Sequence, residues 1–210
     1  MQNILTRKSD ENIEGYLVDM HVHTNFSMDC FVSIDDTLQE LIGKVNALTI
    51  TDHNEMGNHS KTLVESLELK YQIKVLTESV EISTLHGDIL AYGISAVPST
   101  SLEPEQVIDI IHSEGGIAVA AHPFDFLGLG ELIFELNLDA LEINGLRSQL
   151  LNTQAKEAAE TLGLPLIGGS DSHSLKQTGK CVTQFEKPIK TMDDIIKQIK
   201  KGHCKHLFLR

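Results

Sequence analysis

The sequence has no tryptophan, and aromatic residues make up only 5% of its 210 residues. A core must therefore be filled mainly by valine, isoleucine and leucine, and the 41% hydrophobic content can supply one sizeable domain. Cysteine is also scarce, because Cys30, Cys181 and Cys204 form an odd, widely spaced set without a CxxC pair. This set excludes a disulfide framework and favours a reducing compartment, so we expect a cytoplasmic protein.

Long apolar runs and positive charge are lacking as well. No segment is long enough for a signal peptide or a membrane span, so we expect no membrane association. Basic residues number 17 against 30 acidic ones, which gives a formal charge of −13. This balance opposes non-specific binding to nucleic acid, and we expect no stable nucleic-acid complex. Acidic residues that bind metal would make the loaded protein less negative.

Residues 16–23 form an apolar run that ends in two histidines, His21 and His23. In an extended strand alternate side chains share a face, so both imidazoles point the same way and can reach one metal ion. A single such pair is weak evidence, since two partly exposed histidines at a strand end would give the same pattern.

The same pattern, an apolar run ending in a metal-type side chain, recurs five times further along the chain. The later runs end at Asp52 with His53, at Glu81, at His122, at Glu142, and at Asp171 with His173. Mixed histidine and carboxylate ligands suit zinc, manganese or iron. A carboxylate has two oxygens and can bridge two ions that lie about 3.5–4 Å apart. The repeated pattern therefore indicates a metal centre.

Segments with strand and helix patterns alternate along the chain. We expect strands over residues 16–21, 47–51, 74–83, 89–94, 117–121, 140–143, 164–168, 181–185 and 204–209, and helices over 33–45, 60–71, 104–113, 149–162 and 192–201. This α/β alternation favours a mainly parallel sheet closed into a barrel, with the metal site at the C-terminal ends of the strands. An open doubly wound sheet is the alternative, although Gly115-Gly116 precedes a strand and does not form a nucleotide loop.

The motifs resemble those of the PHP domain superfamily, named for polymerase and histidinol phosphatase. In chain order they are DMHVHT at 19–24, TDHN at 51–54, VEIST at 80–84, AHP at 121–123, EING at 142–145 and GSDSH at 169–173. The resemblance covers essentially the whole chain, so we expect one PHP domain over residues 1–210, with a polar arm over 1–15. It implies a distorted (β/α)7 barrel, two or three divalent metals, and most often phosphoester hydrolysis.

The resemblance also implies which residues hold the metals. One metal would be held by His21, His23, Glu81 and Asp171. Glu81 would bridge to a second metal, which also takes His122 and Asp88. A third would lie on His53 and His173, with Asp29 from the preceding loop.

Two positions depart from the commoner family pattern. Many relatives carry an acid or a histidine where Met28 stands, and here the acid is Asp29, one residue later. Many also carry a histidine at the position of Asp88, so His86 is an alternative ligand if the turn between them shifts.

The substrate phosphate needs a basic partner. Arg147 follows a strand end and is the favoured catalytic candidate, with Lys176 second, although either could be a solvated surface charge. His59 is a further candidate for substrate contact. His112, His203 and His206 are expected to be structural or exposed, and the lysines of residues 187–205 to form the solvated face of a helix.

The sequence thus predicts a metal-dependent hydrolase, most simply a phosphatase or phosphodiesterase acting on a small or nucleotide-derived phosphoester. A histidinol-phosphatase-like enzyme, another metal hydrolase such as an amidohydrolase, and a non-catalytic metal-binding module are the alternatives. The nearly complete ligand set argues against the last of these. The sequence leaves open the exact substrate, the metal and the oligomeric state.

Overall fold

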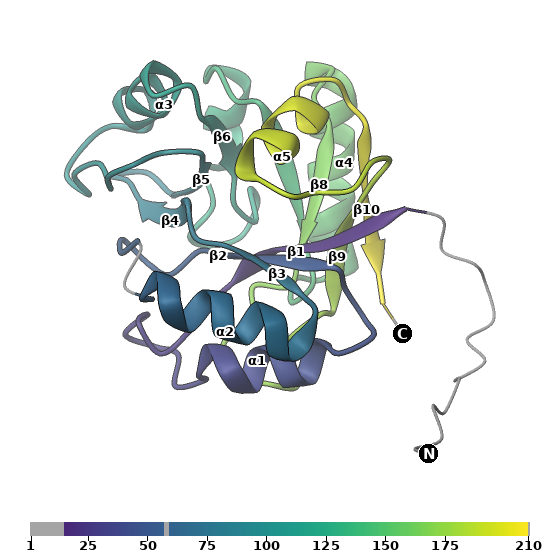
Figure 1. Cartoon of the computed structure of the whole chain (residues 1–210). Coiled ribbons are helices and arrows are strands. Elements are labelled where there is room, and N and C mark those ends of the chain that lie inside the picture. The colour runs from purple at the N-terminus through teal and green to yellow at the C-terminus, as the bar shows by residue number, and fades with distance from the viewer. Residues whose placement is uncertain (1–14, 57–58, 210) are drawn as a thin grey trace, which may run out of the picture.

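The structure, a computed structural model, describes residues 15–56 and 59–209 (Figure 1). Nearly all of the expected N-terminal arm lies outside these residues. The strands are β1 (Tyr16–Val22), β2 (Ala47–Ile50), β3 (Lys74–Leu76), β4 (Ser79–Ser83), β5 (Asp88–Tyr92), β6 (Ile117–Ala120), β7 (Ala140–Asn144), β8 (Leu166–Gly169), β9 (Cys181–Phe185) and β10 (Cys204–Phe208). The helices are α1 (Ile34–Leu41), α2 (Lys61–Tyr71), α3 (Pro104–Ser113), α4 (Gln149–Leu162) and α5 (Met192–Ile199), with a short 3₁₀ helix at Gly130–Phe134.

The strands form a mixed α/β fold with two five-stranded sheets. The first sheet has the order β10-β9-β1-β2-β3 and the second β4-β5-β6-β7-β8. Parallel pairing joins β1, β2 and β3 in the first sheet and β6, β7 and β8 in the second. Antiparallel pairing joins β9 to both β1 and β10, and β5 to both β4 and β6.

The expected closed barrel is therefore not seen in the described residues. The segment 74–83, expected as one strand, is interrupted at Thr77 and Glu78, where the chain passes from the first sheet to the second. Single bridges join Val22, at the end of β1, to Ser172, after β8, and His53, after β2, to Glu81 in β4. Both edge strands of the second sheet are thus connected to the first sheet. The turn from β4 to β5 has no helix, so the antiparallel β5 replaces a helical crossover at this place.

The ends of several helices follow from local sequence. Ser33 accepts a hydrogen bond from the Asp36 N–H and caps α1, as its position in the sequence predicts. Pro104 begins α3, where a missing N–H costs nothing. The helix expected over residues 33–45 ends at Leu41, shortly before Gly43 takes a φ of +71°.

Three main clusters of apolar side chains form the core. Helices α1 and α2 pack on the first sheet, through a cluster that includes Leu38, Leu41, Leu48 and Leu67 (Figure 1). Helices α3 and α4 cover the second sheet with side chains such as Ile108, Ile111 and Ala159. A third cluster joins the two sheets and takes in the apolar face of α5. Among the described residues, no helix has the length and apolarity needed to cross a membrane.

The Tyr92 hydroxyl donates to the Met20 carbonyl oxygen over 2.6 Å, within the cluster that joins the sheets. This bond ties the end of β5 to β1, the strand that carries His21. Burial and the charges of Glu142 and Glu81 raise the pKa of Tyr92 well above its ordinary value, so the phenol keeps its proton for this bond.

Candidate metal centre

The candidate ligands gather at one place because the strand ends carry them there. His21 and His23 come from the end of β1, and His53 follows β2. Glu81 lies in β4, Asp88 begins β5, His122 follows β6, and Asp171 and His173 follow β8. Within the described residues three sets of ligand atoms lie within 4.8 Å of one another: His21, His23 and Asp171; Glu81, Asp88 and His122; and His23, His53 and His173.

The first set converges on a point between two imidazoles. The Nε2 atoms of His21 and His23 lie 2.9 Å apart. Oε2 of Glu81 is 3.3 Å from the first and 3.2 Å from the second, and Oδ1 of Asp171 is 3.5 Å from both. All four side chains are buried. This geometry is that of four donors around one small cation.

The outer nitrogens of the two rings show where their protons lie. The Ser27 hydroxyl donates its one proton to Asp52 over 2.8 Å, so Nδ1 of His23 must donate to Ser27 Oγ at 2.9 Å. Nδ1 of His21 donates to the Glu142 carboxylate at 2.8 Å. When both rings are neutral, their lone pairs face each other at Nε2, and a proton or a metal ion between them relieves that contact. The residues therefore fit a metal ion.

The pKa shifts of His21 and Glu81 also indicate a centre that suits a cation. Burial alone would lower the pKa of His21, but the charges of Glu142, Glu81 and Asp171 outweigh it and raise that pKa well above its ordinary value. Burial would raise the pKa of Glu81, but the His21 charge and hydrogen bonds from neighbouring imidazoles hold it well below its usual range. The site therefore favours positive charge at its centre.

Glu81 belongs to the second set and also borders the first. Its Oε1 lies 3.1 Å from Nε2 of His122, while Oε2 faces His21 and His23 and lies 3.0 Å from Nδ1 of His53. Among the described residues, Oε2 finds no hydrogen-bond partner of good geometry although it is buried, and Nδ1 of His122 finds none either. A buried carboxylate oxygen without a hydrogen bond is a further sign that a cation belongs beside it.

Asp88 and His86 lie in different surroundings. Asp88 is buried beside Glu81 and His122, and burial together with the Glu81 charge raises its pKa to about 6. The His86 side chain is 54% exposed and pairs with Glu103 at 3.1 Å. The structure thus brings Asp88 into the second set and leaves the alternative ligand outside it.

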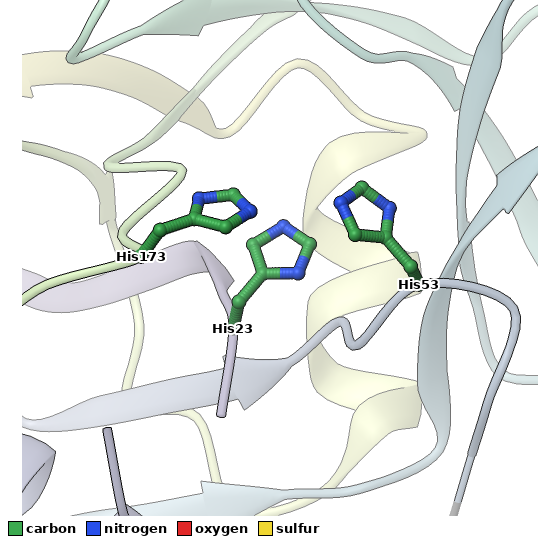
Figure 2. Close-up of side chains that lie close together, drawn as sticks. All are labelled: His23, His53 and His173. Carbon is green, nitrogen blue, oxygen red and sulfur yellow. The ribbon is translucent and has the colours of Figure 1, made fainter. Parts of the chain in front are cut away.

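The third set is more open to solvent. Figure 2 shows the rings of His23, His53 and His173 turned toward one another, with His23 between the other two. The ring centroids of His23 and His173 are 4.1 Å apart, and those of His23 and His53 are 4.4 Å apart. Oδ2 of Asp29 lies 3.2 Å from His173 Nε2 and 3.5 Å from His53 Nε2. Asp29 therefore reaches these histidines from the loop, as the sequence suggested, while Met28 is 97% exposed.

Two candidate ligands have an unusual backbone. His122 has a φ of 28° and Asp171 a φ of 52°, in the left-handed region that side chains other than glycine rarely adopt. The Asp171 N–H donates to the His21 carbonyl oxygen at 2.8 Å and Asp125 N–H to that of His122 at 2.9 Å, so neighbouring bonds hold both turns. Strain of this kind is concentrated at functional sites.

Several polar residues around the ligands were not assigned a role from the sequence. Glu142 accepts from both His21 Nδ1 and the His122 N–H, and Asn144 donates to Glu142 and to Asp171. Asp19 accepts from the N–H and the hydroxyl of Ser170, directly before Asp171. The sequence showed Glu142 at the end of an apolar run without giving it a role, and Asp19 belongs to the run that ends at His21 and His23, which is the signal that could have found it. Ser27 and Asn144 give no such signal.

Arg147 lies beside the centre but is not free. Its Nη2 contacts Oδ2 of Asp171 at 3.0 Å, and its Nε forms an ion pair with Asp125. The guanidinium is thus held between two carboxylates at the edge of the first set. Lys176 makes no side-chain hydrogen bond or ion pair with the part of the chain that the structure describes.

His59, His112 and His203 lie outside the three sets of candidate ligands. His59 is 3.3 Å from the Thr24 hydroxyl and meets the Phe26 ring edge-on, at the rim of the third set. His112 pairs with Asp139 at 2.7 Å, and His203 pairs with Glu186 at 3.4 Å, both away from the candidate ligands.

Comparison with known proteins shows two matching family models. The model of the PHP domain matches residues 19–127, and a model described as PHP-associated matches residues 149–204. An uncharacterized protein of Methanocaldococcus jannaschii, MJ1587, is 31% identical over 138 residues, which are 60% of this chain and 79% of that protein.

Solved structures share the fold. PsfC from Pseudomonas syringae aligns with a TM-score of 0.70 at 21% identity, over 94% of this chain and 93% of its own. A two-domain Bacteroides vulgatus protein containing a predicted PHP-like metal-dependent phosphoesterase aligns with a TM-score of 0.71 at 18% identity, over 92% and 64%. Endonuclease Q, in complex with a 27-mer duplex, aligns with a TM-score of 0.64 at 16% identity, over 90% and 58%.

Proposed function

The chain belongs to the PHP domain family, and from this premise we propose that it is a metal-dependent phosphoric ester hydrolase acting on a small or nucleotide-derived phosphoester. The observation that carries the proposal is the pair of imidazole nitrogens 2.9 Å apart, each with its proton directed to the far side of the ring. Carboxylates of Glu81 and Asp171 complete this set.

We assign the residues to three positions. His21, His23, Glu81 and Asp171 would hold one ion. Glu81, Asp88 and His122 would hold a second, and His53, His173 and Asp29 a third. The mixture of imidazole and carboxylate donors suits zinc, manganese or iron. When bound, a pair of such ions lowers the pKa of water and stabilises charge on the attacking and leaving oxygens of a phosphoester.

The surrounding residues would keep the donors aligned. Glu142 fixes the proton of His21 on Nδ1, and Ser27 with Asp52 does the same for His23, so that both Nε2 atoms remain donors of electron pairs. Arg147 would bring a positive charge beside Asp171, where the substrate phosphate must bind. Asp125 would hold the guanidinium in that position.

Exposed apolar side chains on the loops around the centre support a substrate with an apolar part. Met28 and Phe31 lie on the loop that carries Asp29, with exposed fractions of 97% and 91%, and Phe126 follows Asp125 with 94%. Side chains of this kind beside the centre could contact an apolar part of a substrate. Sugar phosphates would not use these side chains, whereas a nucleobase would.

We further propose that residues 1–210 form one PHP domain whose two sheets are a distorted form of the seven-fold barrel, and that the enzyme works in the cytoplasm. Its three cysteines are free, and two of them are buried. Burial raises the pKa of Cys204 to about 12 and also raises that of Cys181, so neither thiol is reactive near neutral pH.

The proposal is tested first with a chromogenic phosphate ester. The purified protein should contain at least about one equivalent of divalent metal and should hydrolyse the ester after addition of manganese, zinc or iron, with loss of activity in a chelator. A panel of phosphomonoesters, dinucleotides and bisphosphates then ranks the substrates. A protein that hydrolyses amides but none of these esters, or that retains no metal after metal-supplemented expression, would contradict the assignment.

A second prediction concerns Asp88, where the chain departs from the commoner family pattern. Asp88→Ala should lose one metal equivalent while the fold is kept, because it removes an anionic oxygen from the set with Glu81 and His122. Asp88→His should raise the retention of zinc relative to manganese, since imidazole is the softer ligand. Metal analysis and activity measure both effects.

His86→Ala is the matched control for this position. It removes a nearby imidazole that is half exposed and paired with Glu103, so metal content and turnover should stay close to wild type. If His86→Ala loses the metal and Asp88→Ala does not, the ligand is assigned to the wrong residue.

A further inference from the structure

A second feature of the chain has no part in the metal centre. Loop 186–190, helix α5 and the turn before β10 enclose a depression of about 470 Å³, which we call the basic pocket. It is lined by Lys187, Pro188, Lys190, Asp194, Lys197, Gln198, Lys201 and His203. We propose that this pocket binds a small anion with several phosphate groups, at a site separate from the metal centre.

The charge of this region is opposite to that of the whole chain. Residues 176–209 contain eight lysines and three carboxylates, in a protein whose formal charge is −13. Four of these lysines lie around the basic pocket, and Asp194 is the one carboxylate of its lining. Like charges held close together repel one another, so the cluster is unfavourable until an anion binds.

Few ion pairs neutralise the lysines of the pocket. Four lysines elsewhere form ion pairs with carboxylates: Lys44 with Glu40, Lys61 with Glu65, Lys70 with Asp35 and Lys74 with Glu68. In the pocket Lys197 lies 3.5 Å from Asp193. The ammonium groups of Lys187, Lys190 and Lys201 have no such partner within residues 15–56 and 59–209. Three unpaired positive charges therefore face one pocket in a protein with an excess of acid.

The backbone that carries these lysines is fixed. The buried side chain of Gln198 accepts from the Lys187 N–H at 2.9 Å and donates to the Lys187 carbonyl oxygen at 3.1 Å. The Asp194 carboxylate accepts from the N–H groups of Lys190 and Thr191, both at 3.0 Å. The loop is thus held against α5 before any ligand arrives, which lowers the entropic cost of binding.

The basic pocket is remote from the metal centre. Tyr16, at the start of β1, pairs with Phe185, at the end of β9, so Lys187 lies near the opposite end of β1 from His21. His21 lies five positions along the strand from Tyr16, which corresponds to roughly 17 Å at about 3.3 Å per residue. A ligand of the pocket could not be held by the metal ligands at the same time.

The chemistry of the lining favours a small polyphosphate over other anions. Lysines are compact point charges that bind phosphate oxygens well, and several of them match an anion with several charges. The volume lies in the range of small-molecule sites. No aromatic side chain lines the pocket, so stacking of nucleic-acid bases has no support there.

Binding of inorganic tripolyphosphate, measured by isothermal titration calorimetry on the full chain, tests the proposal. We expect saturable binding of one equivalent per chain, weakened about tenfold or more by Lys201→Glu, because the reversal exchanges an attraction for a repulsion. Lys187→Glu should have the same effect. The matched control is Lys200→Glu, which makes the same change of net charge one residue earlier but outside the pocket, and should alter the affinity less than threefold.

Each outcome decides the proposal. If Lys200→Glu weakens binding as much as Lys201→Glu, the anion meets only the diffuse field of the helix, and the pocket is not a site. If Asp171→Asn abolishes the tripolyphosphate signal while Lys201→Glu leaves it unchanged, the anion binds at the metal centre instead. Tighter binding of a duplex oligonucleotide than of tripolyphosphate, lost in Lys201→Glu, would replace the small anion by nucleic acid.

Discussion

Glu81→Gln should lower turnover of a phosphate ester by more than about 100-fold and reduce the metal content of the purified protein. The loss of an outer partner of a metal ligand already costs roughly 10–100-fold in affinity or activity, and Glu81 has a more central place than such a partner. Its two oxygens lie within 3.3 Å of ring nitrogens of four histidines: His21, His23, His53 and His122. Glutamine keeps the shape but replaces one oxygen by an N–H donor and removes the charge.

The measurement is elemental analysis together with the rate on the best ester of the panel. Glu78→Gln is the matched control. Glu78 is the exposed residue immediately before β4, so its substitution makes the same chemical change outside the site. It should keep both metal and rate. Circular dichroism should show that Glu81→Gln is folded, since the substitution conserves volume. A folded Glu81→Gln protein with wild-type metal content and rate would remove Glu81 from the centre.

The candidate ligands could be named from the sequence because all but Asp29 follow, begin or lie in a strand. Strands leave a local signal in the alternation of apolar residues. His21, His53, Glu81 and Asp171 were thus named from four separate segments, and the sheets bring those segments together. Each candidate ligand can therefore be recognised from its neighbours in the sequence, although the residues of the site come from distant segments.

The closure of the sheets could not be predicted in the same way. Residues 74–83 form one continuous pattern, yet the chain leaves the first sheet at Thr77 and enters the second. The direction of β9 depends on its pairing with the distant β1, and the local pattern of a strand is the same in parallel and antiparallel sheets. The alternation of strands and helices favoured a closed barrel and the family resemblance implied a distorted (β/α)7 barrel, whereas the structure has two five-stranded sheets joined by single bridges.

The residues that orient the ligands were missed for a related reason. Ser27 acts through both Asp52 and His23, and Asn144 through Glu142 and Asp171. These partners are up to 27 residues apart, and serine and asparagine are common in loops whatever their role. Arg147 was named as a phosphate ligand, and its contacts with Asp125 and Asp171 could be seen only once the fold was known.

Gly169→Ala should damage both stability and activity, because this glycine lies directly behind His21, a candidate metal ligand. A Cβ at this position would overlap Oε1 of Glu142 and Cβ of His21, and both atoms are buried. Neither can move freely, since His21 Nδ1 and Glu142 Oε1 are joined by a 2.8 Å hydrogen bond. Overpacking of this kind typically lowers the free energy of unfolding by about 1–3 kcal/mol.

The displacement of His21 should lower turnover by more than the loss of stability alone would. A misplacement of about 1 Å in a catalytic group can lower a rate about 100-fold, so turnover should fall by that order in folded protein. Gly163→Ala separates the two effects. Gly163 ends α4 with a φ of +69° and has open space around a built Cβ, so its replacement should lower the free energy of unfolding by about 1–2 kcal/mol through backbone strain. Its turnover should stay at the wild-type level. If thermal unfolding and the rate on a phosphate ester change in parallel in both variants, the effect of Gly169→Ala is one of stability alone, and the position of His21 behind Gly169 does not set the rate.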